Sequence, residues 1–122
     1  MDKSPQIKIE LINIQLGCML KVARLKKNLS QHDLALTLDT DPTAIGRIER
    51  AEVISGWDKI FKLAEELQID FAMLFSLQPK NHLLGLIEEI IHLEEKLTSE
   101  KEKYYSNLKQ EVKEKFRKLS IL

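Results

Sequence analysis

The sequence predicts an all-α fold, a bundle of five helices followed by one long helix. The chain has 122 residues, which is enough for one compact domain with an appendage. It contains only 4 Gly and 3 Pro, and none of them follows Gly85. Apolar residues recur at helical spacing, and the alternation typical of strands is nearly absent. Helices therefore account for most of the chain.

The first helix is predicted over residues 6–27 and ends at Asn28, which tolerates the left-handed conformation. Two apolar stripes run along it, and two stripes indicate that a helix is covered on both sides. A short strand over residues 6–16 stays open as the alternative, because apolar residues also alternate there. The stripes are Ile9, Ile12, Leu16, Leu20 and Ala23, and Ile7, Leu11, Ile14, Cys18, Val22 and Leu25.

The next four helices are short, and their starts carry capping residues. Ser30 and Asp33 have the spacing of a capping box. Asp41 precedes Pro42, which suits the first position of a helix, and Asp70 caps the last of the four. These helices are predicted at residues 31–38, 42–50, 57–67 and 71–77.

The tail is predicted to be one helix from residue 83 to about residue 119. Leucines repeat along it every 11 residues, close to 3.67 residues per turn. We expect this seam, with the outer stripe of the first helix, to join two copies of the chain. The predicted dimer interface is Leu86, Ile90, Leu93, Leu97, Tyr104, Leu108 and Val112.

Charge along the tail is polarised. Residues 88–102 contain six Glu and two Lys, a net charge of −4, and residues 103–118 contain six Lys or Arg and two Glu, a net charge of +4. The dipole of a single helix favours this order, and so does antiparallel pairing of two tails. A hairpin, with Thr98 starting a second helix, stays open as a third possibility. The absence of Gly and Pro favours the continuous helix.

Residues 31–50, QHDLALTLDTDPTAIGRIER, carry a more specific pattern. Ala35 is small where two helices cross, Asp39 occupies the turn, and Ile45 and Ile48 are spaced as anchors on a buried face. With its flanking residues this run resembles the helix-turn-helix of the lambda-repressor-like, XRE-type family. The resemblance covers about residues 16–76. It implies a helix-turn-helix domain over 1–77, a joint over 78–82 and a dimerising helix over 83–122.

The resemblance also implies which residues meet DNA. It assigns Arg24 and Glu49 to a structural ion pair, and Lys26, Lys27 and Arg50 to phosphate contacts. By its chemistry, Arg47 can bind a guanine edge and Thr43 can contact a thymine methyl group. The residues that would face the DNA groove are Gln31, Pro42, Thr43, Ala44, Gly46 and Arg47.

The net charge of the predicted domain indicates that two copies of the chain bind DNA together. Residues 1–76 have 10 Lys and Arg against 11 Asp and Glu, a net charge of −1. Because phosphate contacts dominate affinity, one such domain should bind weakly by itself. We therefore expect a homodimeric, repressor-like transcriptional regulator on an operator of two half-sites. The alternative is a protein-interaction or antirepressor-like module of the same fold, using Val53, Ile54 and the tail.

Other function classes are disfavoured by composition. Lys and Arg number 19 against 19 Asp and Glu, so the chain is no polycation, and no apolar run approaches the roughly 18 residues of a membrane span. No export leader is evident and Cys18 is the one cysteine, which together favour the cytoplasm. Glu89 and His92 have a metal-site spacing but lack converging carboxylates. We expect no enzyme activity, no cofactor, no metal and no evident pocket for a small effector.

Overall fold

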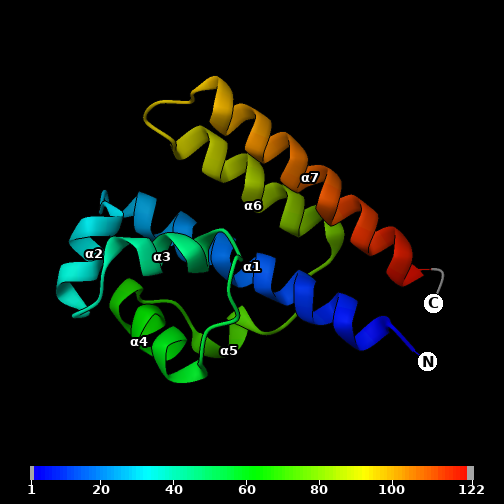
Figure 1. Ribbon diagram of the computed structural model, residues 1–122, viewed down its shortest axis with the longest axis horizontal. Coiled ribbons are helices and arrows are strands. Elements are labelled where there is room, and N and C mark those ends of the chain that lie inside the picture. Colours follow the sequence, from blue (N-terminus) through cyan, green and yellow to red (C-terminus); the bar gives the residue numbers. More distant parts are fainter. Residues whose placement is uncertain (1, 121–122) are drawn as a thin grey trace.

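The computed structural model describes residues 2–120, and these form seven α-helices and no strand. The all-α prediction is therefore confirmed. Figure 1 shows a long central helix, α1, with α2–α5 on one side and an antiparallel pair, α6 and α7, on the other. The helices are α1 Ser4–Lys26, α2 Gln31–Thr37, α3 Pro42–Glu49, α4 Trp57–Leu67, α5 Phe71–Leu74, α6 Lys80–Leu93 and α7 Ser99–Ser120.

The predicted helix signals are present at the starts of α2, α3 and α5. The Ser30 hydroxyl accepts a hydrogen bond from the Asp33 N–H at 2.9 Å, and the Asp33 carboxylate accepts one from the Ser30 N–H at 3.0 Å. Asp41 accepts from the Ala44 N–H, and Asp70 caps α5 in the same manner. The turn between α2 and α3 passes through Asp39 at φ 51°, the left-handed conformation expected there.

Helix α1 lies between two hydrophobic cores, as its two stripes predicted. It is helical throughout residues 4–26, so the strand alternative for 6–16 is wrong. The first core joins α1 to α2–α5 and is built on Leu16, Leu20, Leu34, Ala35, Ile45, Ile48, Ile60, Leu63, Ala64, Leu67 and Leu74. The second joins α1 to α6 and α7 and is built on Leu11, Ile14, Cys18, Val22, Leu83, Ile87, Ile90, Tyr105 and Val112.

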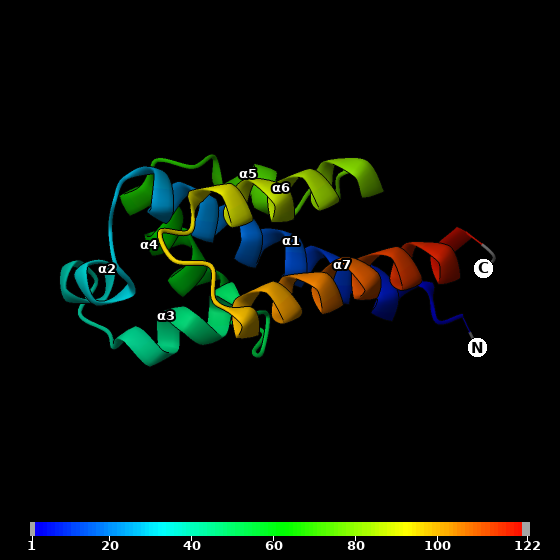
Figure 2. The same ribbon diagram turned by 90° about the horizontal axis from the view of Figure 1, so that it is seen from above.

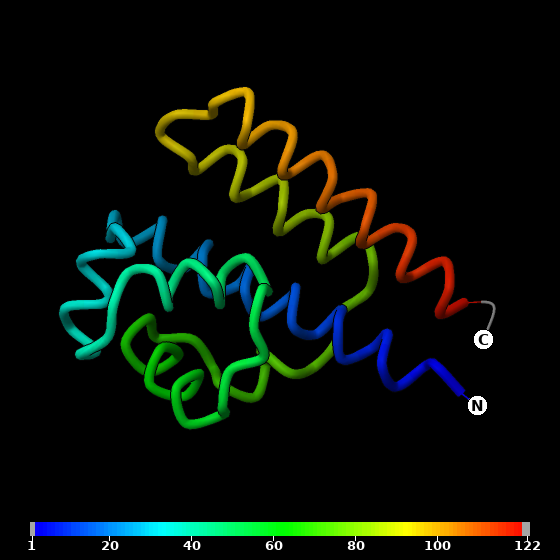
Figure 3. Tube along the Cα trace, viewed as in Figure 1, coloured from blue at the N-terminus to red at the C-terminus, as the bar shows by residue number. Residues whose placement is uncertain are grey.

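The prediction of one continuous helix in the tail is wrong. Residues 94–98 separate α6 from α7, and the chain reverses there, as the tube in Figure 3 shows. At 1.5 Å per residue, a straight helix over 83–119 would be about 55 Å long, whereas α1 is about 35 Å long. Folding back lets both helices cover α1. Residues 121 and 122 of the predicted helix lie outside the described residues, and α6 begins at Lys80, inside the predicted joint.

The seven residues predicted to join two chains pack within one chain instead. Ile90 and Val112 are fully buried in the second core, and the other five are packed against it. Tyr105, which we did not predict, is more deeply buried than Tyr104. The hairpin therefore supplies the cover that was expected from a second copy. A dimer of this protein would need another surface.

Ion pairs hold the hairpin together and attach it to α1. Lys109 of α7 pairs with Glu88 of α6, so the acidic and basic halves of the tail meet antiparallel within one chain. Lys26 of α1 lies 2.6 Å from Glu89. Lys115 lies 2.9 Å from Glu10, where it holds the pKa of the Glu10 carboxyl below its usual value. None of the described helices is long and apolar enough to cross a membrane.

Candidate nucleic-acid interface

Helix α3 presents one face to the solvent while its other face is buried in the first core. Its start is set by the Asp41 cap and by Pro42 at the first helical position. Ile45 and Ile48 point into the core, and Thr43 and Arg47 are exposed. Pro42 and Ala44 are half-buried. Figure 2 shows α2 and α3 side by side at one end of the molecule, away from both termini.

Gly46, which the resemblance assigned to the face that meets the DNA groove, is buried. A Cβ atom at this position would lie 2.9 Å from Arg50 Nη1 and 3.3 Å from Gln31 Oε1. The missing side chain therefore leaves room for two other residues assigned to DNA contact.

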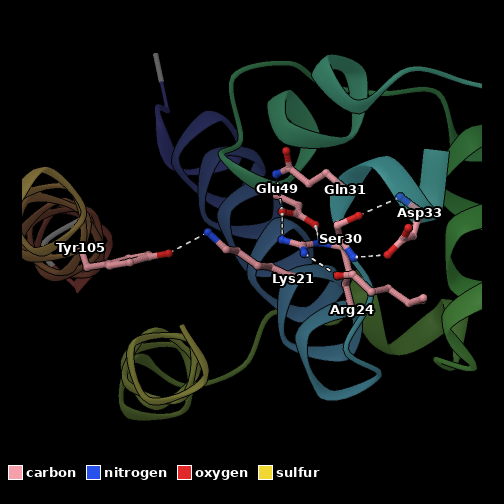
Figure 4. A network of polar contacts seen from close by, with 8 residues as sticks. Lys21, Arg24, Ser30, Gln31, Asp33, Glu49 and Tyr105 are labelled. Atoms are coloured by element: carbon pink, nitrogen blue, oxygen red, sulfur yellow. Dashed lines mark hydrogen bonds and ion pairs between the residues drawn. The ribbon is translucent and has the colours of Figure 1, made fainter. Parts of the chain in front are cut away.

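A buried polar network positions Gln31 (Figure 4). Arg24 donates to both carboxylate oxygens of Glu49, at 2.7 and 3.0 Å, so the ion pair implied by the resemblance is present. The same guanidinium donates to the Leu29 carbonyl at 2.8 Å. Gln31 Nε2 donates to Glu49 at 3.0 Å. The network ties α1, α2 and α3 together and holds the Gln31 amide beside the exposed face of α3.

The other basic candidates already have partners within the chain. Lys26 pairs with Glu89, Arg50 pairs with Glu52, and Lys27 donates to the Gln68 side chain at 2.8 Å. Arg47 differs, because within residues 2–120 its exposed guanidinium takes part in no hydrogen bond or ion pair. The two ion pairs lie at the surface and are weak, and the partner of Lys27 is a neutral amide, so a phosphate can replace all three partners.

Sequence reasoning missed one cluster beside this face, at the tip of the hairpin. Lys21 Nζ of α1 donates to the Tyr105 hydroxyl of α7 at 2.7 Å, as drawn in Figure 4. That hydroxyl lies 3.3 Å from Glu94, and Lys101 lies 3.0 Å from Glu94. Burial raises the pKa of Tyr105 and lowers the pKa of Lys21. No local pattern could have placed α7 beside Lys21, because the contact spans 84 residues.

Comparison with known proteins agrees with this geometry. Residues 20–74 match the family model described as helix-turn-helix. This segment is therefore a helix-turn-helix domain of the XRE, lambda-repressor-like type, and the resemblance seen in the sequence is confirmed. A domain of this type indicates a DNA-binding transcription regulator. Searches among curated proteins and among solved structures found no match.

Proposed function

We propose that this protein binds double-stranded DNA sequence-specifically by inserting the exposed face of α3 into the major groove. The observation that carries the proposal is that Thr43 and Arg47 project from a helix whose opposite face is locked into the first core. A rigid helix with short polar side chains and one unpaired guanidinium suits base reading in that groove.

The chemistry of each contact follows from the side chains. Arg47 presents two parallel N–H donors that fit the O6 and N7 acceptors of guanine. Gln31 can pair with an adenine edge, and its amide is already oriented by Glu49. Thr43 and Ala44 provide apolar contact with a thymine methyl group. Lys26, Lys27 and Arg50 are assigned to phosphates, which position the domain without reading sequence.

The regulator acts, in this proposal, as a homodimer on two half-sites about 34 Å apart. One domain of net charge −1 makes too few phosphate contacts for tight binding, whereas a dimer makes twice as many. Because the α6–α7 hairpin packs on its own chain, we assign the contact with a second copy to an aromatic strip on α4, on α5 and on the residue after α5. The strip consists of Trp57, Phe61, Phe71 and Phe75. Phe61 contacts Phe71, and Phe71 contacts Phe75, with ring centroids 5.5 and 5.0 Å apart. Trp57, 70% exposed, lies one helical turn before Phe61 on α4. Phe71 is half-buried, and Trp57, Phe61 and Phe75 are exposed. Exposed apolar side chains gathered on one surface mark an interaction site.

Removing the Arg47 side chain should abolish most of the DNA binding. An arginine–guanine pair contributes about 1–3 kcal/mol of discrimination, so Arg47→Ala should weaken binding to a selected duplex by about 5- to 150-fold. Adding Lys27→Ala should also flatten the salt dependence. Fluorescence anisotropy between 50 and 300 mM salt measures both effects, on duplexes recovered by selection from a random pool. Arg117→Ala, an exposed arginine on α7, is the matched control.

No binding by the unmodified chain to any duplex at about 50 mM salt and micromolar protein would contradict the proposal. That result would favour the protein-interaction module, whose predicted contact residues Val53 and Ile54 are both exposed.

Placing a charge in the aromatic strip should dissociate the dimer. Trp57→Asp is expected to lower the mass measured by light scattering from twice 14.2 kDa to 14.2 kDa, because a carboxylate cannot be buried unpaired at an apolar interface. Leu36→Asp is the matched control, since Leu36 is 69% exposed on α2, outside the strip. A dimer mass that survives Trp57→Asp, or a monomeric unmodified chain, would overturn this assignment.

A further inference from the structure

A cleft of about 630 Å³ separates the helix-turn-helix domain from the tip of the α6–α7 hairpin. Gln31, Pro42 and Arg50 line one wall, and Lys101 and Tyr104 line the other, with Lys21 also in the lining. The first wall is the edge of the surface assigned to base reading. The second belongs to α7, which lies outside the segment that matches the family.

The charges around this cleft leave one cation in excess. Arg24 is paired with Glu49, Arg50 with Glu52, and Lys101 with Glu94. Lys21 instead donates to the neutral Tyr105 hydroxyl. Burial is also the main cause of the lowered pKa of Lys21, which means that its ammonium group lacks full solvation. An anionic oxygen entering the cleft would supply the missing stabilisation.

We propose that the phosphodiester backbone of bound DNA passes through this cleft, with one phosphate held by Lys21 and Lys101. The inference rests on the proposed function. Every base is joined to a sugar and a phosphate, which lie at the edge of the DNA groove. If Gln31 contacts a base, the phosphate of that nucleotide therefore lies close to Gln31, which lines the cleft. The hairpin thus adds a second, non-family wall to the DNA-binding surface. Glu94 is the opposing acid, since it lies against both Tyr105 and Lys101.

Two substitutions with opposite expected effects test the proposal. Lys101→Ala should lower the slope of log affinity against log salt by about 1, because one phosphate contact contributes about 0.9 to that slope. Relative to 1 M salt, this corresponds to about eightfold weaker binding at 0.1 M. Glu94→Gln keeps a hydrogen-bond acceptor but removes the negative charge, so it should tighten binding and leave the fold intact. If the Lys101–Glu94 pair had a purely structural role, both variants would bind DNA as tightly as the unmodified chain or more weakly.

The measurement uses the full chain and a labelled duplex of about 20 base pairs, titrated at five salt concentrations, with circular dichroism melting to check the fold. Lys113→Ala is the matched control, because Lys113 is exposed on α7 and lines a separate pocket with Lys80 and Phe116. If Lys101→Ala behaves like Lys113→Ala while Arg47→Ala still weakens binding as expected, the cleft proposal is overturned and the proposed function stands. If the unmodified chain binds no duplex, both are overturned.

Discussion

Replacing Glu49 by alanine is expected to lower the free energy of unfolding by about 3–5 kcal/mol. The Glu49 side chain is only 2% exposed, and it accepts hydrogen bonds from Arg24 and from Gln31. Its removal leaves the buried Arg24 guanidinium with the Leu29 carbonyl as its remaining partner. The cost arises from that unpaired charge, which has lost its hydration and its counter-ion.

Urea unfolding followed by circular dichroism measures this loss. Removing both charges, as in Arg24→Met with Glu49→Leu, should recover most of it, because the buried charge is then absent. Glu114→Ala is the matched control, since Glu114 forms an exposed pair with Arg117 and should show no measurable effect. If Glu49→Ala lowers the free energy of unfolding by less than about 1 kcal/mol, the prediction is wrong, and the Arg24 guanidinium is hydrated by water when its partner is removed.

Replacing Gly17 by alanine is expected to destabilise the protein by about 1–3 kcal/mol, even though alanine is the better helix former. A Cβ atom at position 17 would lie 2.7 Å from the carbonyl oxygens of both Ile48 and Glu49. These are backbone atoms at the end of α3, so relief requires α1 and α3 to separate. Their separation would also strain the Arg24–Glu49 pair and shift the exposed face of α3.

Gly85 provides a control of opposite sign. It lies within α6, and a Cβ atom there would meet nothing within 4 Å. Gly85→Ala should therefore stabilise the protein by up to about 1 kcal/mol through helix propensity alone. The same urea experiment compares the two variants. Equal and favourable effects of both would mean that α1 and α3 are less tightly packed than the structure shows.

Local chemistry made the helix-turn-helix domain predictable. The Ser30–Asp33 capping box and the Asp41 cap act over three residues, so the sequence alone locates the starts of α2 and α3. The spacing of Ile45 and Ile48 likewise determines which face of α3 is buried. The Arg24–Glu49 pair was predictable only through the family resemblance, because its partners are 25 residues apart.

The hairpin was less predictable because its position depends on contacts between residues far apart in the sequence. No Gly or Pro marks the break at residues 94–98, and Glu94 ends α6 by adopting an extended conformation. The hairpin alternative, with Thr98 starting a second helix, is confirmed: α7 begins at Ser99, and the Thr98 hydroxyl accepts a hydrogen bond from the Lys101 N–H at 3.2 Å. Lys26 illustrates the consequence for the site. The sequence offered it as a phosphate contact, and the folded hairpin brings Glu89 to 2.6 Å from it. The cleft beside Gln31 could not be predicted either, since its second wall depends on where α7 lies.

The sequence by itself predicted only part of the seven-helix arrangement. It determined α3, the cap of α3 and the need to cover both stripes of α1, because these features depend on neighbours within one or two helical turns. Only the tertiary structure decided what covers the outer stripe. A five-residue connection holds α7 next to α6 at a far higher effective concentration than a second chain could reach. The tail leucines therefore pack within their own chain, and α7 lies beside the surface that we propose reads DNA.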